Sequence, residues 1–218
     1  MKANLLKLSL IAAASFVVSN ALAADLPRPV YKAPAYVADP IFSWTGFYIG
    51  ANAGYGFGKS DWDFPAGTST SPKGFVGGGQ IGYNYQIGSF VFGLEGDYDY
   101  SAMKGDTACG GTTCTTKNTW LATGRGRIGY AFDRFLPYFT GGVAFGNVKA
   151  ETPLAGASSN RTGYALGGGL EYAMFGAWSV RAEYLYVDLG SFNAAVAPLT
   201  NNVSFKANVV RAGINYRF

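Results

Sequence analysis

Nine charged side chains stand at alternating positions within otherwise apolar, glycine-rich segments of this 218-residue sequence. Acidic and basic types are mixed, so two kinds of chemistry are open to them. Carboxylate pairs can act as general acid and base, and carboxylates beside guanidinium groups can form ion pairs in an interior of low dielectric constant. The nine residues are Glu95, Asp97, Asp99, Arg125, Arg127, Glu171, Arg181, Glu183 and Arg211.

Catalysis is the weaker interpretation of these residues. The sequence has no histidine, which is the commonest general base and the commonest metal ligand. Glu171 and Glu183 could be cast as an acid and a base, but we expect them to be buried among arginines without a substrate cleft. The glycine run at 77–82 lacks the lysine and the helix of a phosphate-binding loop. We therefore expect neither an enzyme nor a bound cofactor.

The two cysteines, Cys109 and Cys114, lie in the short segment CGGTTC. A metal site would need further ligands, and none is nearby. In an exported protein such a pair favours a local disulfide. Closing so short a loop would contribute roughly 2 kcal/mol on the chain-entropy model, so the bond would stiffen a loop tip without holding the fold together.

The charged residues belong to segments in which apolar and polar side chains alternate with a period of two, which is typical of β-strands with two different faces. The apolar side of each segment carries aromatic residues, and the other side carries glycine and charge. Eight such segments are expected, at 46–58, 77–86, 90–100, 119–132, 136–147, 163–174, 178–190 and 208–218.

The connections between these segments alternate in length. Tight turns are expected near 87–89, 133–134 and 175–177, and longer polar loops near 59–73, 102–118, 149–161 and 190–202. Short turns on one rim and long loops on the other are typical of outer-membrane barrels. The sequence therefore predicts an all-β fold, an eight-stranded antiparallel up-and-down transmembrane β-barrel with both termini in the periplasm.

The amino-terminal region predicts export. Lys2 and Lys7 precede a short apolar run, and Ala21-Leu22-Ala23 fits a cleavage site between Ala23 and Ala24. We expect a signal peptide at 1–23, a proline-rich periplasmic tether at 24–42 and a barrel at 43–218. Loss of the two lysines leaves 15 basic and 13 acidic residues. A net charge of +2 without a basic cluster gives no reason to expect nucleic acid as a partner.

A soluble eight-stranded barrel is the competing fold, but it would place apolar side chains inside and charge outside. The last segment shows the reverse arrangement. Val210, Ile214 and Tyr216 share the face expected to meet lipid, whereas Arg211 and Asn215 share the other face. A charge on the lipid side near the middle of the membrane would cost about 2–4 kcal/mol, and the alternation avoids that cost.

Ordered motifs, among them FSWTGFYIGANAGYGFG, FVGGGQIGYNYQ, GRGRIGYAF and EYLYVDLG, resemble one family from about Phe42 to the end of the chain. It is the family of small alphaproteobacterial outer-membrane proteins with an OmpA-like eight-stranded barrel, which includes RopB-like proteins and haemin-binding surface proteins. The peptidoglycan-binding domain of full-length OmpA proteins is not expected here. The resemblance also implies that the terminal pattern Ile214, Tyr216 and Phe218 is a signal for the outer-membrane assembly machinery.

The resemblance further implies a link to the cell wall. Some members that begin with Ala-Asp are joined to peptidoglycan through their terminal amine by an L,D-transpeptidase, and Ala24 and Asp25 match that start. The expected function is a structural barrel that supports the envelope in contact with outer-membrane lipid and lipopolysaccharide. A receptor for haemin or a host ligand, acting through the four loops, and a narrow pore remain alternatives. If the protein is a structural barrel, we expect Glu95 and Asp97 to pair with Arg125 and Arg127 and Glu171 to lie beside Arg181, so that ion pairs plug the lumen.

Overall fold

The computed structural model describes residues 42–62, 68–109, 112–152, 155–196 and 199–218. The predicted signal peptide, its cleavage site and the predicted tether up to residue 41 lie outside the described residues. Residues Pro40–Phe218 form one compact unit. The described residues contain no helix that is long and apolar enough to cross a membrane.

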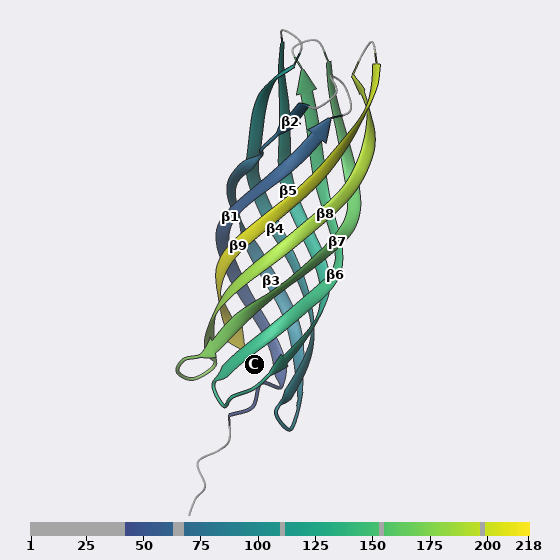
Figure 1. Cartoon of the computed structure of the whole chain (residues 1–218). Helices are drawn as coiled ribbons and strands as arrows, with labels where there is room; N and C mark the ends of the chain where they lie inside the picture. The colour runs from purple at the N-terminus through teal and green to yellow at the C-terminus, as the bar shows by residue number, and fades with distance from the viewer. Residues whose placement is uncertain (1–41, 63–67, 110–111, 153–154, 197–198) are drawn as a thin grey trace, which may run out of the picture. The chain divides into compact units, whose positions relative to one another are not determined.

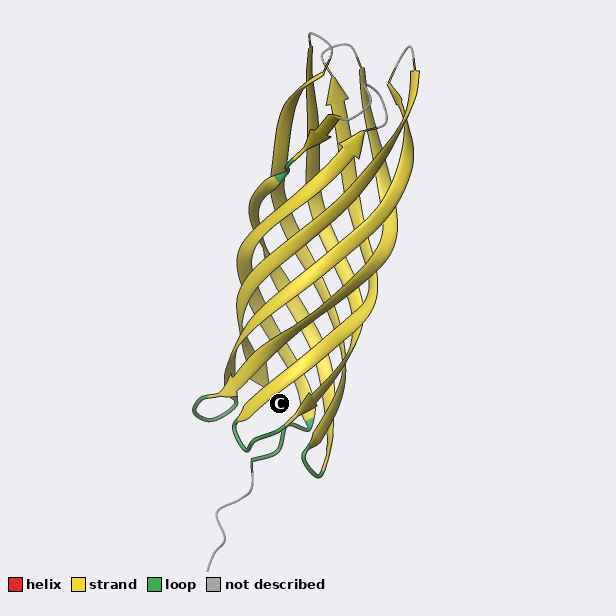
Figure 2. Ribbon diagram, in the orientation of Figure 1, coloured by secondary structure: helices red, strands yellow, loops and turns green. Residues whose placement is uncertain are grey.

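Eight long strands and one short strand make up this unit (Figures 1 and 2). Alternating apolar and glycine residues let each long strand show a different surface to each side. The strands are β1 (Gly46–Trp62), β2 (Thr68–Thr70), β3 (Lys73–Ile87), β4 (Phe90–Cys109), β5 (Thr112–Tyr130), β6 (Phe135–Thr152), β7 (Ala155–Ala173), β8 (Trp178–Val196) and β9 (Leu199–Arg217).

The strands pair in chain order, each antiparallel to the next, and β1 pairs with β9 from Tyr48↔Arg217 to Trp62↔Val203. This last pairing closes the sheet, so no long edge is left open. The short β2 pairs with the end of β1 and stands in the place where β3 would continue beyond Pro72. The prediction of an eight-stranded antiparallel barrel is confirmed.

Three short turns lie together on one rim, which also carries the carboxyl terminus (Figure 1). We call this end the turn rim. Each turn contains one residue in the left-handed region: Gly88, Asp133 and Gly176, with φ of 60°, 55° and 59°. The backbone there bends without a steric clash at the two glycines.

The opposite end, which we call the hairpin rim, differs from the prediction. Long irregular loops were expected at 59–73, 102–118, 149–161 and 190–202, but most of these residues belong to strands. For example, β4 and β5 remain paired as far as Cys109↔Thr112, and β6 and β7 remain paired as far as Thr152↔Ala155. Polar composition favours a loop, but these hairpins keep their backbone hydrogen bonds and remain strands.

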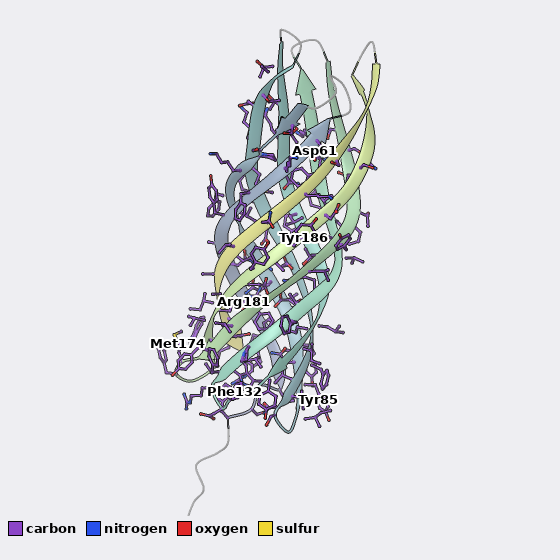
Figure 3. All side chains as sticks on the ribbon, in the orientation of Figure 1. Asp61, Tyr85, Phe132, Met174, Arg181 and Tyr186 are labelled. Carbon is purple, nitrogen blue, oxygen red and sulfur yellow. The ribbon has the colours of Figure 1, made fainter. Side chains whose placement is uncertain are left out.

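Large apolar side chains cover the outside of the barrel, as expected for a surface in contact with lipid. Leu94, Phe139 and Tyr98 are 72%, 76% and 60% exposed. Aromatic side chains lie near both ends of this surface, as in the girdles of outer-membrane barrels. Tyr85 and Phe132 lie toward the turn rim, whereas Tyr186 lies nearer the middle and Asp61 toward the hairpin rim (Figure 3).

The inside of the barrel is not polar throughout, contrary to the simple alternation that the sequence suggested. Toward the hairpin rim the inward side chains form an apolar layer, which includes Val76, Met103, Leu121, Val148, Leu185, Val187, Leu189, Phe205 and Val209. Gly56 faces this layer, and a Cβ there would overlap the Sδ atom of Met103. The glycine therefore makes room for a larger neighbour.

A second apolar group closes the turn rim. Phe42 packs against buried Trp44, with ring centroids 5.1 Å apart, and Trp44 packs with Val91, Ala131, Leu136 and Ala173. The indole Nε1 of Trp44 donates to the Asp133 carbonyl oxygen at 3.0 Å, and its backbone N donates to Gln86 Oε1 at 2.7 Å. We refer to Phe42, Trp44 and these four apolar residues as the rim plug.

The outer surface yields a direct test at Val143, which lies on β6 between the outward aromatic residues Phe139 and Phe145 and is 49% exposed. Val143→Arg should lower the free energy of unfolding in lipid vesicles by about 2–4 kcal/mol, because a guanidinium group would be placed in hydrocarbon. The measurement is urea unfolding followed by tryptophan fluorescence. Val143→Leu is the control and should unfold close to the parent; equal stability of the arginine variant would contradict the outward assignment.

Candidate functional site: a buried ion cluster

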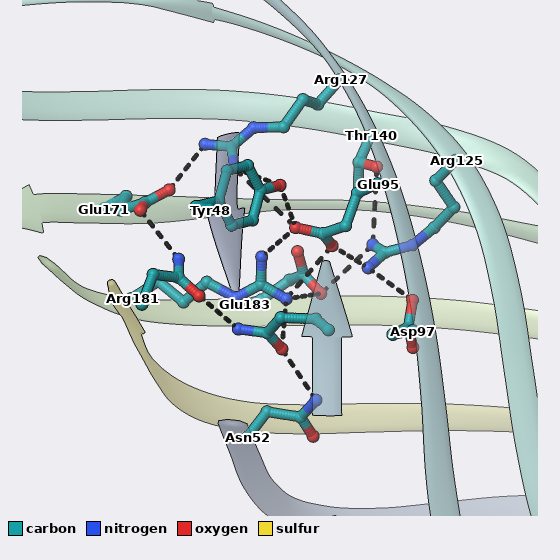
Figure 4. Close-up of polar contacts among 12 residues, drawn as sticks. Tyr48, Asn52, Glu95, Asp97, Arg125, Arg127, Thr140, Glu171, Arg181 and Glu183 are labelled. Carbon is teal, nitrogen blue, oxygen red and sulfur yellow. Dashed lines mark hydrogen bonds and ion pairs between the residues drawn. The ribbon is translucent and has the colours of Figure 1, made fainter. Parts of the chain in front are cut away.

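The nine charged residues singled out in the sequence come together inside the barrel, between the rim plug and the apolar layer. Figure 4 labels all of them except Asp99 and Arg211. They lie on β4, β5, β7, β8 and β9, at positions whose side chains point inward, and each is at most 6% exposed. We call them the ion cluster: Glu95, Asp97, Asp99, Arg125, Arg127, Glu171, Arg181, Glu183 and Arg211.

Arg125 joins three carboxylates from three directions. Its Nη2 lies 2.5 Å from Glu95 Oε1 and 3.1 Å from Asp97 Oδ2, and its Nη1 lies 3.2 Å from Glu183 Oε1. Glu95 is directly opposite Arg125 in the β4–β5 register, whereas Glu183 reaches it from β8. The guanidinium therefore connects the β4–β5 wall to the opposite side of the lumen.

Arg211 likewise joins three carboxylates, and it lies closer to the hairpin rim than Arg125 does. Its Nη1 contacts Asp97 at 2.9 Å and Asp99 at 2.6 Å, and its Nη2 contacts Glu183 at 2.7 Å. Asp97 and Glu183 are thus shared with Arg125, and Glu183 also lies 3.9 Å from Arg181, so each of these carboxylates has at least two cationic partners. Shared partners make the cluster a network and not a set of separate pairs.

The expected proximity of Glu171 and Arg181 is present in the register but does not give the main ion pair. The two residues are opposite each other on β7 and β8. Glu171 is instead bound by Arg127 at 2.7 Å, and Arg181 contacts Glu95 across the lumen. The strand register predicts neighbours along the wall, but long arginine side chains reach partners on the far wall.

Uncharged polar groups complete the network, and the sequence interpretation did not identify them as members. Tyr48 donates to Glu95 Oε2 at 2.6 Å, and Tyr138 donates to Glu183 Oε2 at 2.7 Å. Gln80 donates to Asn215 at 2.6 Å, and Asn215 donates to Glu171 at 2.9 Å. Tyr138 could have been found from its spacing, since it is two residues from inward-facing Thr140.

The Arg127 guanidinium also lies over the ring of Tyr138, 4.1 Å from its centroid. Glycine at position 82 leaves space for Tyr48, because a Cβ there would overlap the phenol ring. The two aromatic rings therefore occupy volume between the charged groups that water could otherwise fill. A cation–π contact of this kind contributes about 2 kcal/mol when it is desolvated.

Four arginines face five carboxylates in the cluster, so acidic groups are in excess by one when all are ionised. Removing a cation would leave several carboxylates without part of their compensation, whereas neutralising one carboxylate would not. The dense cross-linking suits a rigid internal support.

Ala23, Ala24 and Asp25 lie outside the described residues. Cys109 ends β4 and Cys114 lies in β5, but their side chains are outside the described parts, so the disulfide stays a prediction. Ile214, Tyr216 and Phe218 all face outward, and Trp178 and Phe218 both pack edge-on against Tyr216. Their reading by the assembly machinery also stays a prediction.

Comparison with known proteins agrees with this architecture. Residues 9–218 match the family described as the outer membrane protein beta-barrel domain. The chain belongs to this family. It is 36% identical to the 31 kDa outer-membrane immunogenic protein of Brucella melitensis, over 94% of this chain and 96% of that protein. It is 35% identical to the 22 kDa outer membrane protein of Rhizobium leguminosarum bv. viciae, over 82% and 80%.

Among solved structures, Neisserial surface protein A superposes with a TM-score of 0.50 at 17% identity, covering 80% of this chain and 98% of that one. At this identity the similarity concerns the fold alone. The family match and the two alphaproteobacterial relatives confirm the predicted family and place the protein in the outer membrane of a Gram-negative bacterium.

Arg125 is the strongest test of the ion cluster. Arg125→Met keeps most of the side-chain volume but removes the charge, so Glu95, Asp97 and Glu183 each lose a partner. Breaking a buried ion pair from one side costs about 3–5 kcal/mol, and urea unfolding of the barrel refolded in vesicles should show a loss of this order. Asp99→Asn is the matched control: it removes the excess negative charge and should cost clearly less. Equal losses for both variants would argue against the network.

Proposed function

We propose that the protein is a non-enzymatic, non-conducting structural barrel that supports the cell envelope. The observation that carries this proposal is the filling of the lumen. From the turn rim inward, the rim plug, the ion cluster and the apolar layer follow one another, and nearly all of their side chains are buried. An eight-stranded barrel has an interior just wide enough for side chains.

The electrostatics of the cluster support the same proposal. A conducting lumen needs a water-filled path with charges free to meet passing ions. Here each of the nine charged groups is held by at least one opposite charge, for example Arg125 by Glu95 and Arg211 by Asp99. Apolar side chains lie on both sides of the cluster, so an ion would have to shed its water before reaching it. A narrow pore therefore has less support than a sealed barrel.

Single-channel recording in planar bilayers tests this proposal. The parent protein should give no conductance steps, because no hydrated path crosses the three layers. A positive control can be built by removing the bulk of both apolar seals, with Trp44→Ala and Phe205→Ala combined. The control should raise the frequency of conductance events. Regular, ion-selective steps from the parent protein would refute the sealed barrel.

A second part of the proposal is a covalent link to the cell wall through Ala24. Its support is the resemblance of the start Ala24-Asp25 to wall-linked members and the four prolines at 27, 29, 34 and 40. Proline-rich chain extends by roughly 3.1 Å per residue, which gives the segment 24–42 a reach on the order of 50–60 Å. We place this segment, with both ends of the barrel, in the periplasm, where peptidoglycan lies.

The link can be tested on isolated sacculi. After boiling in detergent, a fraction of the protein should stay with the sacculus, and muramidase digestion should release an amino-terminal peptide whose Ala24 carries a peptidoglycan fragment. The insertion of a proline before Ala24 in the mature chain should abolish the linked form, since it replaces the primary amine by a secondary one. If all copies in the parent strain begin with unmodified Ala24, the tether does not exist.

A further inference from the structure

Four lysines form a continuous row across four neighbouring strands near the hairpin rim. Lys73 on β3 is directly opposite Lys104 on β4, Lys104 is opposite Lys117 on β5, and Lys117 is opposite Lys149 on β6. We call these four residues the lysine row. With strands about 4.8 Å apart, the row extends over roughly 14 Å of the outer surface.

All four lysines belong to the outer face of the barrel. The inward neighbours Met103, Asn118 and Val148 are buried beside Lys104, Lys117 and Lys149. Lys73 and Lys104 are exposed, and Lys117 and Lys149 are partly exposed. Like charges directly opposite each other in a sheet are destabilising. An anion on the outer side of the barrel would therefore stabilise these three successive pairings.

The position of the lysine row along the strands indicates which layer of the membrane surrounds it. On each of the four strands the nearest outward aromatic residue lies two to four positions toward the middle of the barrel; these residues are Phe75, Tyr100, Trp120 and Phe145. Aromatic side chains mark the interface between hydrocarbon and head groups. At about 3.3 Å per residue, the lysines lie roughly 7–13 Å farther along the strands, which is the level of lipid head groups.

Two further outward lysines, Lys59 on β1 and Lys206 on β9, are also directly opposite each other, but each has a carboxylate neighbour. Lys59 lies 3.1 Å from Asp61, and Lys206 lies 3.8 Å from Asp188. Within the row, Lys104 lies 3.0 Å from Asp106. Lys73 and Lys149, at the two ends of the row, have no ion-pair partner among the described residues. The β3–β6 side of the barrel therefore presents a local excess of positive charge.

We propose that the lysine row binds the phosphate groups of the glycolipid in the outer leaflet, the lipopolysaccharide in which this barrel is embedded. The amines supply the cations, and the aromatic residues below them lie against the acyl chains of the same lipid. The assignment rests on the proposed topology only in placing the hairpin rim outside the cell. It gives one side of the barrel a specific layer of bound lipid, which a sealed barrel does not require.

A binding titration tests this proposal directly. Fluorescent lipopolysaccharide is added to the full mature protein, folded in detergent micelles, and compared with the same lipid after chemical removal of its phosphates. The variant carries Lys73, Lys104, Lys117 and Lys149 all replaced by Gln. Its affinity should fall at least about tenfold, because each basic side chain at an anionic lipid surface contributes several-fold. The dephosphorylated lipid should bind the parent as weakly, and added salt should weaken parent binding.

The matched control carries Lys59→Gln and Lys206→Gln, which removes two other outward lysines that are directly opposite each other and already have carboxylate partners. Its affinity should change by less than about threefold. Inorganic pyrophosphate at concentrations equal to the lipid should not compete, since it lacks acyl chains. Unchanged affinity of the row variant, or of the dephosphorylated lipid, would overturn the proposal, and so would competition by pyrophosphate at equal concentration.

Heat-dependent mobility on gels establishes that each variant is folded before titration. Should the fourfold variant fail to fold, Lys73→Gln combined with Lys149→Gln takes its place, because these two ends of the row are the uncompensated ones. The double variant should still lose several-fold affinity relative to the Lys59 and Lys206 control. Equal affinities of these two double variants would refute the row as the binding site.

Discussion

The pairing of β1 with β9 is the constraint on which the rest of the structure depends. Lipid offers no hydrogen-bond partners, so every backbone N–H and C=O group at membrane depth must be paired within the protein. Closing the sheet satisfies this requirement from Tyr48 to Trp62 along the seam. Closure of eight strands then fixes a narrow interior, and the period of two assigns alternate side chains to lipid and to that interior.

The narrow interior in turn explains the ion cluster. Charged groups on facing walls are close enough for Arg125 to reach Glu183 and for Arg181 to reach Glu95. Each such contact ties together strands that are not neighbours in the sheet. Backbone hydrogen bonds hold adjacent strands only, so these side-chain bridges add a second, transverse set of connections. Such transverse connections suit a barrel that must keep its shape.

Sequence reasoning predicted the fold because its cause is local. Alternation in 46–58 or 208–218 is visible without any partner strand, and so are the turns around Gly88 and Gly176. Register pairs such as Glu95 with Arg125 also follow from one short turn. The partners across the lumen could not be predicted, because they depend on tilt and stagger of the whole barrel. Tyr48 and Tyr138 were missed since most tyrosines of this chain, such as Tyr98, face outward, so the residue type alone does not indicate the lumen.

The error at the hairpin rim has a physical cause that the interior makes clear. Along β9 the inward residues change from Arg211 to Val209 and Phe205, while the outward residues change from Val210 to Lys206. Strand β9 thus reverses its polarity: charge inside and apolar groups outside at the level of the hydrocarbon, then apolar groups inside and charge outside at the level of the head groups. The outer part resembles a soluble barrel with its own apolar core. A core of this kind keeps the polar hairpins paired as strands. Composition alone suggests loops in these segments because it does not reveal that core.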